Sequence, residues 1–279
     1  MSQFFKYVLS FCFSLVLLVA CSEKQQVQTD SSEFTNDITF DCNSEIQHDL
    51  NAPPEIAPLF VNSVVSTDFD FITTDDSSEF TELNYIGRSV REMPGNSSGI
   101  LIDDAAFVYQ AIFSDTIIEI WLHSDFEDRQ VAGDYALKLT GPLGRLPDFM
   151  RIGLKHVVVQ DGNAAAFGEH IGNFFVVYSK NIDTRIANHD LEETVFHESV
   201  HATMDLACEQ PESSWNLARV KDNTYITSYA AELPEKEDLA ESALFAYSMI
   251  KHSGRLPSEV ESWIRTNTPN RLLFFYSIF

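Results

Sequence analysis

The chain has 279 residues, of which 44% are hydrophobic, and this is enough apolar material to build a core and to exclude disorder of the whole chain. Its 42 acidic and 18 basic side chains give a formal net charge of −24, which argues against nucleic acid as a partner. An acidic surface mainly indicates solubility, so the charge by itself names no substrate.

The first 20 residues have the features of an export signal. Lys6 precedes an apolar run that is too short for a comfortable membrane-spanning helix, and a small residue then stands before Cys21. The sequence Leu18-Val19-Ala20-Cys21 resembles the lipobox of bacterial lipoproteins, which implies cleavage before Cys21 and lipidation of that cysteine. By resemblance to the usual sorting pattern, Ser22 favours the outer membrane of the cell envelope. A plain signal peptide or an uncleaved anchor is the alternative.

Composition divides the rest of the chain. The polar segment that follows Cys21 is typical of a flexible tether. We therefore expect a signal peptide at 1–20, a lipidated cysteine with its tether at 21–37, a β-rich portion at 38–126 and the main region at 127–279. The last two are expected to form one compact domain.

The predicted elements in the first half are mixed. Two apolar stretches, 105–113 and 116–123, flank the turn-forming pair Ser114-Asp115 and predict a β-hairpin. Helical spacing over 128–140 ends at Gly141-Pro142, and two further strands are expected. These strands span 156–160 and 173–179.

The second half is expected to be helical. Beyond residue 190 the strand patterns disappear, and the spacing predicts helices over 191–207, 235–252 and 257–265. Asp190 followed by Glu193 resembles a capping box at the start of the first of these. The fold class that follows is α+β, with a mixed sheet packed on this helix.

The helix over 191–207 carries the chemistry. It contains His197-Glu198-Ser199-Val200-His201, and residues four apart on a helix share one face, so both imidazoles can reach one metal ion. Neutral imidazole is a good zinc ligand. Glu198 lies on an adjoining face, where it can take a proton from a metal-bound water.

A third ligand is expected from the helix that follows Pro234. Glu237 and Glu241 are four residues apart there, and either carboxylate could complete a site of two histidines and one glutamate. Asp205, four residues after His201, could orient an imidazole, although an exposed helix carboxylate has the same spacing.

These segments resemble a known family. HESVHATMD looks like the active helix of gluzincin metallopeptidases, and KEDLAES is similar to their second glutamate-bearing segment. The resemblance implies a zincin-like fold, one Zn²⁺ per chain and a peptide or protein substrate. It implies Glu237 as the zinc ligand and Glu241 as a carboxylate that orients a metal-binding histidine.

Three further features are less specific. Tyr229 resembles the tyrosine that donates to the oxyanion in lethal-factor-like gluzincins, with Tyr225 as a rival and packing in the core as the alternative for both. The segment GEHIGNFFVVYS resembles the edge strand along which zincins bind extended substrates. His170 in this segment could line a cleft, but an isolated histidine near a glycine-rich turn is more often a surface residue.

Only Cys42 and Cys208 remain for an oxidising compartment if Cys12 leaves with the signal and Cys21 carries lipid. The two cysteines either form a disulfide or are two buried free thiols, and the sequence does not decide between these states.

The sequence therefore predicts a lipid-anchored zinc metallopeptidase. Two alternatives remain. One is a non-catalytic lipoprotein that uses the fold as a binding module, and the other is a zinc hydrolase with a non-peptide substrate.

Overall fold

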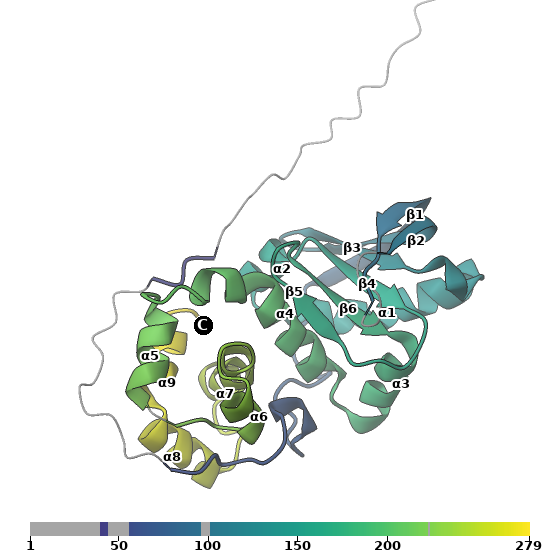
Figure 1. The fold of residues 1–279 in the computed structure, drawn as a ribbon. Coiled ribbons are helices and arrows are strands. Elements are labelled where there is room, and N and C mark those ends of the chain that lie inside the picture. The colour runs from purple at the N-terminus through teal and green to yellow at the C-terminus, as the bar shows by residue number, and fades with distance from the viewer. Residues whose placement is uncertain (1–39, 44–55, 96–100, 223) are drawn as a thin grey trace, which may run out of the picture. The chain divides into compact units, whose positions relative to one another are not determined.

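A six-stranded mixed sheet organises one half of the molecule (Figure 1). The computed structural model describes residues 40–43, 56–95, 101–222 and 224–279. In chain order the strands are β1 (Phe80–Glu92), β2 (Ile102–Phe113), β3 (Ile117–Leu122), β4 (His156–Gln160), β5 (Phe167–Glu169) and β6 (Phe174–Tyr178). In space the order is β1-β2-β3-β4-β6-β5. Only the β3–β4 and β4–β6 pairs are parallel.

The predicted hairpin is confirmed. β2 and β3 pair antiparallel, with Ile112 opposite Ile117 next to the turn. In β3 the buried and more exposed positions alternate, because one face of the strand packs on the core. Central strands β4 and β6 are instead buried at nearly every position, because helices pack on one face and a small cluster that includes Met93 and Ala164 packs on the other.

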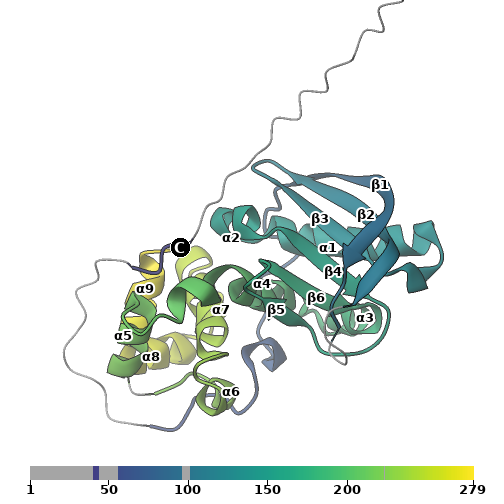
Figure 2. The ribbon, with the colours of Figure 1, turned by 45° about the horizontal axis from the view of Figure 1, so that its top comes forward.

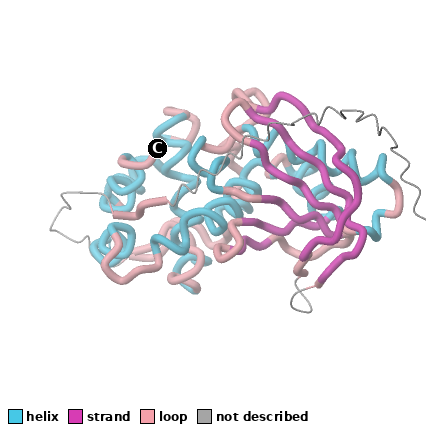
Figure 3. Tube along the Cα trace, turned by 90° about the horizontal axis from the view of Figure 1, so that it is seen from above, coloured by secondary structure: helices cyan, strands magenta, loops and turns pink. Residues whose placement is uncertain are grey.

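Helices cover one face of the sheet and form the other half of the molecule (Figure 2). The longer helices are α1 (Arg129–Gly144), α3 (Ser179–Asn188), α4 (Leu191–Cys208), α5 (Ser214–Asp222), α7 (Asp238–Lys251), α8 (Ser258–Asn267) and α9 (Pro269–Tyr276). The shorter ones are η1 (Val64–Ser66), η2 (Ser124–Phe126), α2 (Asp148–Gly153) and α6 (Ser228–Glu232). Seen from above, the strands gather on one side and most helices on the other (Figure 3).

Helix α4 lies between the two halves. It contacts α1, β5 and β6 on the sheet side and α7 on the helical side. Most of its side chains are therefore buried, including polar ones such as Glu193 and Ser199. The predicted α+β class with a mixed sheet packed on this helix is confirmed.

Several element boundaries differ from expectation. Helix α1 continues through Gly141-Pro142 to Gly144, because a proline in the last turn of a helix removes only one backbone hydrogen bond. The capping box is absent: Asp190 makes no side-chain cap and pairs with Arg185, while Glu193 points to the core. Helix α7 begins at Asp238, three residues after its expected start.

The sheet crosses the expected boundary at residue 126. Strands β1 to β3 come from the β-rich portion, and β4 to β6 from the region after it. Residues 36–279 form one compact unit. The signal peptide, Cys21 and the tether at 21–37 lie outside the described residues. Among those that are described, no helix has the length and apolarity needed to cross a bilayer.

The segment 56–76, called the strap below, joins the two halves. Phe60 forms a parallel bridge with Thr227 and exchanges backbone hydrogen bonds with Ile226 and Ser228. Further along, the Ser63 hydroxyl and the Val64 N–H donate to one buried carboxylate on α7. The strap is therefore held along the helical half before it reaches the sheet.

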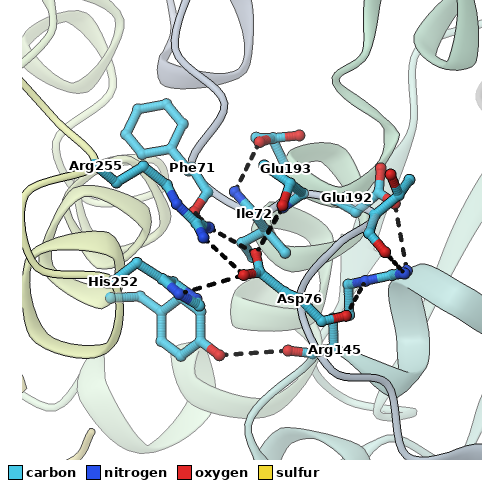
Figure 4. Close-up of polar contacts among 11 residues, drawn as sticks. Phe71, Ile72, Asp76, Arg145, Glu192, Glu193, His252 and Arg255 are labelled. Atoms are coloured by element: carbon cyan, nitrogen blue, oxygen red, sulfur yellow. Dashed lines mark hydrogen bonds and ion pairs between the residues drawn. The ribbon is translucent and has the colours of Figure 1, made fainter.

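A polar cluster anchors the end of the strap (Figure 4). Both terminal guanidinium nitrogens of Arg255 donate to Asp76, at 2.6 and 2.7 Å, and one of them also donates to the Phe71 carbonyl. The Arg255 hydrogen bonds hold the pKa of Asp76 well below its usual range. Arg145 donates to the carbonyl oxygens of Thr74 and Asp76. Arginines from both halves thus bind the same short segment.

Glu193 lies beneath this cluster and gives the fold a pH dependence. Its side chain is 1% exposed and accepts a hydrogen bond from Ile72 N–H at 3.1 Å. Burial raises the pKa of Glu193 from 4.5 to about 7. Since the folded state binds this proton more tightly than the unfolded chain, stability falls as pH rises from about 4.5 to about 7 and is then constant, a loss of about 3 kcal/mol.

We therefore expect Glu193→Gln to raise the free energy of unfolding at pH 8 by up to about 3 kcal/mol and to change it little at pH 4. Urea unfolding at both pH values measures this. Glu259→Gln, which removes an exposed carboxylate on α8, is the matched control and should show no such difference. If the free energy of unfolding changed with pH equally in Glu193→Gln and the wild type, Glu193 would not be the group that causes the pH dependence.

The N-terminal described residues are fixed to the end of α4 by a disulfide between Cys42 and Cys208, with their Cα atoms 5.3 Å apart. It closes a loop of 166 residues along the chain, so it restricts the unfolded chain strongly. Of the two states that the sequence left open, the structure contains the bridged one.

Candidate metal centre

The two histidines and Glu198 lie where helical spacing predicts. His197 and His201 are one turn apart on α4, and their Nε2 atoms face each other at 3.2 Å. Glu198 is 8% exposed and lines one cleft together with both histidines. The helix is rigidly packed on both sides, so it presents the three side chains at a fixed spacing.

Glu237 completes a triangle of ligand atoms. It occupies the N-cap position of α7, and its Oε2 lies 3.3 Å from Nε2 of His197 and 3.4 Å from Nε2 of His201. For ligands about 2.05 Å from a zinc ion, tetrahedral geometry sets the distance between ligand atoms at about 3.3 Å. These three residues could therefore hold a metal ion, and their spacing fits zinc.

Two carboxylates flank the histidines on the side away from this triangle. Asp205 Oδ2 lies 2.8 Å from Nδ1 of His201, at hydrogen-bonding distance. Glu241 Oε1 lies 3.8 Å from Nδ1 of His197, which is too far for a hydrogen bond. Within the described residues Nδ1 of His197 is buried and has no hydrogen-bond partner. The expected orienting contact is thus present for Asp205 and not for Glu241.

Glu241 instead binds residues of the strap. It is fully buried, and its carboxylate accepts hydrogen bonds from Ser63 Oγ, Val64 N–H and Thr227 Oγ1 at 2.6 to 2.7 Å. The sequence did not indicate this role, because the strap has no spacing that ties it to α7.

The ionisation of the site follows from its burial. Burial raises the pKa of Glu198, although the two neighbouring histidines oppose this. Burial also acts to raise the pKa of Glu237, but its contacts with His197 and His201 outweigh it and hold that pKa far below its usual range. The Asp205 and Glu237 contacts raise the pKa of His201 in spite of its burial. Glu198 is therefore the carboxylate of the site with the greater proton affinity.

Of Tyr225 and Tyr229, Tyr229 is the one that lines the cleft. It lies on α6 and lines the same cleft as Glu198 and Glu237. Burial and then the Glu237 carboxylate raise its pKa, so the hydroxyl keeps its proton and can donate. Tyr225 does not line this cleft. The Arg271 guanidinium carbon lies 5.2 Å from the centroid of its ring.

The edge of the sheet also lines the cleft, but it is not the strand that the sequence indicated. The segment GEHIGNFFVVYS folds back on itself, so β6 lies inside the sheet and the three-residue β5 is the terminal strand. Gly168 of β5 lies against the backbone of α4: an added Cβ would be 2.3 Å from His201 Cβ and 2.8 Å from the Glu198 carbonyl oxygen. Only glycine permits this approach.

The cleft has a volume of about 440 Å³, and most of its lining side chains are polar, although Ala166 and Phe167 also line it. Glu169, Glu209 and Lys236 also line it. Glu169 belongs to the segment that resembled an edge strand, and Glu209 continues the four-residue spacing of His197, His201 and Asp205, whereas nothing in the sequence indicates Lys236. His170, for which the sequence favoured a surface position, also lines the cleft and is half-buried.

Comparisons with models of protein families, with curated proteins and with solved structures found no match to this chain. Cys21, the expected lipidation site, lies outside the described residues.

Proposed function

We propose that the chain is a zinc-dependent peptidase of the gluzincin type, with a zincin-like fold around α4 and α7. The observation that carries the proposal is the triangle of His197 Nε2, His201 Nε2 and Glu237 Oε2, with sides of 3.2 to 3.4 Å. Glu198 lies beside this triangle without belonging to it, which is the placement of a general base.

A zinc ion held there would polarise a substrate carbonyl and lower the pKa of a water toward 7. Glu198 accepts a proton from the attacking water and later passes it to the leaving amine. Its raised pKa suits both steps, since a base of higher proton affinity accepts more readily. The Tyr229 hydroxyl donates to the carbonyl oxygen as that oxygen gains negative charge.

Strand β5 supports a peptide as the substrate. As the terminal strand of the described sheet, it offers backbone groups to an extended chain, and it lines the same cleft as the ligand residues. Asp205 keeps the His201 imidazole oriented through its 2.8 Å contact with Nδ1.

The proposal includes an anchor. Residues 1–20 direct export and are removed, and lipid on Cys21 holds the protein in a bacterial envelope, at the outer membrane in preference to the inner one. The partners are then a peptide or protein substrate and the membrane, without nucleic acid.

The test uses the full chain. We expect one tightly bound zinc per chain by elemental analysis, cleavage of a quenched peptide library, and loss of cleavage on chelation that stoichiometric zinc restores. A correctly folded chain without tight zinc binding contradicts the proposal. Tight zinc without peptide cleavage would favour the two alternatives, a binding module or a hydrolase with a different substrate.

A further inference from the structure

A second group of ligand side chains lies in the cleft. His170, Asp205 and Glu209 each offer one ligand atom, and these atoms all lie within 4.8 Å of one another. The group shares no member with the triangle of His197, His201 and Glu237. It is also more exposed, since His170 and Asp205 are half-buried and Glu209 is exposed.

The two groups are consecutive on one face of α4. Residues 197, 201 and 205 follow each other at intervals of four on α4, and Glu209, the C-cap residue just after the helix, continues the stripe; all four line the cleft. The first two supply imidazoles to the triangle, and the last two supply carboxylates to the second group. His170 comes from the turn after β5, so two separate elements converge here.

We propose that His170, Asp205 and Glu209 form a second binding site for a transition-metal dication such as Zn²⁺. One imidazole and two carboxylates suit zinc, whereas calcium takes oxygen ligands only. A carboxylate has two oxygens, so the contact of Asp205 Oδ2 with His201 leaves the other oxygen for an ion. The second site binds more weakly than the first, because the exposed Glu209 side chain must be ordered on binding, so only the first site keeps its ion when no free zinc is present.

Asp205 links the two sites. It contacts His201 directly and belongs to the second group, so an ion at the second site withdraws charge from the carboxylate that orients a ligand of the first. The proposal itself does not depend on peptidase activity, because the second ion binds whether or not the chain cleaves a substrate.

The test is zinc binding to the full, metal-free chain, followed by calorimetry and by elemental analysis after dialysis at fixed free zinc. We expect two zinc ions per wild-type chain. His170→Asn and Glu209→Gln should each bind one, with the tighter site unchanged, and Glu237→Gln should keep the weaker site. Millimolar Ca²⁺ should not displace the weaker ion.

Glu212→Gln is the matched control, because it removes an exposed carboxylate close to Glu209 in the sequence and outside the group. It should bind two zinc ions as the wild type does. One zinc per wild-type chain at saturation would overturn the proposal, and so would two in both His170→Asn and Glu209→Gln. Loss of the second ion in Glu212→Gln would also overturn it, since binding would then depend on charge alone. Two zinc ions without cleavage would contradict the peptidase proposal and support this one.

Discussion

Glu198→Gln is expected to reduce peptide cleavage by about 10²- to 10⁴-fold while the protein keeps one tightly bound zinc. Glutamine has nearly the same shape but cannot accept the proton from the attacking water. Glu198 lies outside the triangle of ligand atoms, so zinc content should not change. Initial rates on a quenched peptide and elemental analysis of the same sample measure the two quantities.

The control for this variant is Glu232→Gln, the same chemical change at an exposed position on α6 that does not line the cleft. It should retain wild-type rates and zinc content. If Glu198→Gln cleaved peptides at the wild-type rate, another group would have to be the base. If it lost zinc, Glu198 would be a ligand.

Glu237→Gln and Glu241→Gln are expected to have opposite effects. Loss of a ligand carboxylate should weaken zinc binding by about 100-fold or more, beyond the usual effect of changing an orienting residue. Glu241 accepts three hydrogen bonds in a fully buried position, so Glu241→Gln should lower the free energy of unfolding by about 2 to 3 kcal/mol. Zinc binding should then remain within about tenfold of the wild type.

Competition with a chromophoric chelator measures zinc affinity, and urea unfolding of the metal-free proteins measures stability. The two variants are controls for each other, because they make the same change one helical turn apart. The reverse result, with zinc lost in Glu241→Gln and stability lost in Glu237→Gln, would make Glu241 the third ligand.

The central residues of the candidate site could be predicted because they depend on local geometry. The spacing of His197 and His201 places both on one face of any helix, whatever surrounds it. The residues alone do not distinguish Glu237 from Glu241, since both have an equally good position on the same segment. The choice depends on where α7 begins and how it meets α4, and both are tertiary properties.

What the sequence could not supply are contacts between distant segments. The strap lies far from α7 in the chain, so no periodicity indicated that Glu241 would hold Ser63 and Val64. The same limit applies to His170, whose neighbours Asp205 and Glu209 come from another element. The disulfide between Cys42 and Cys208 cannot be deduced from the sequence for the same reason, since the sequence gives no distance.

Local patterns also failed where burial overrides them. Asp190 and Glu193 have the spacing of a capping box, but Glu193 lies in the core beneath the strap and bonds Ile72 N–H. The aromatic C-terminal segment, for which no element was expected beyond residue 265, forms helix α9 with Pro269 in its first turn.

The contact at Gly168 holds β5 against the backbone of α4 and the Cβ of His201. Because β5 touches the backbone of α4 there, the gap between the edge strand and the helix does not depend on the size of neighbouring side chains. Under the proposed function, substitutions at 167 and 169 are expected to change the lining of the cleft while the distance between β5 and α4 stays constant. A side chain at 168 would instead push the strand away from the helix.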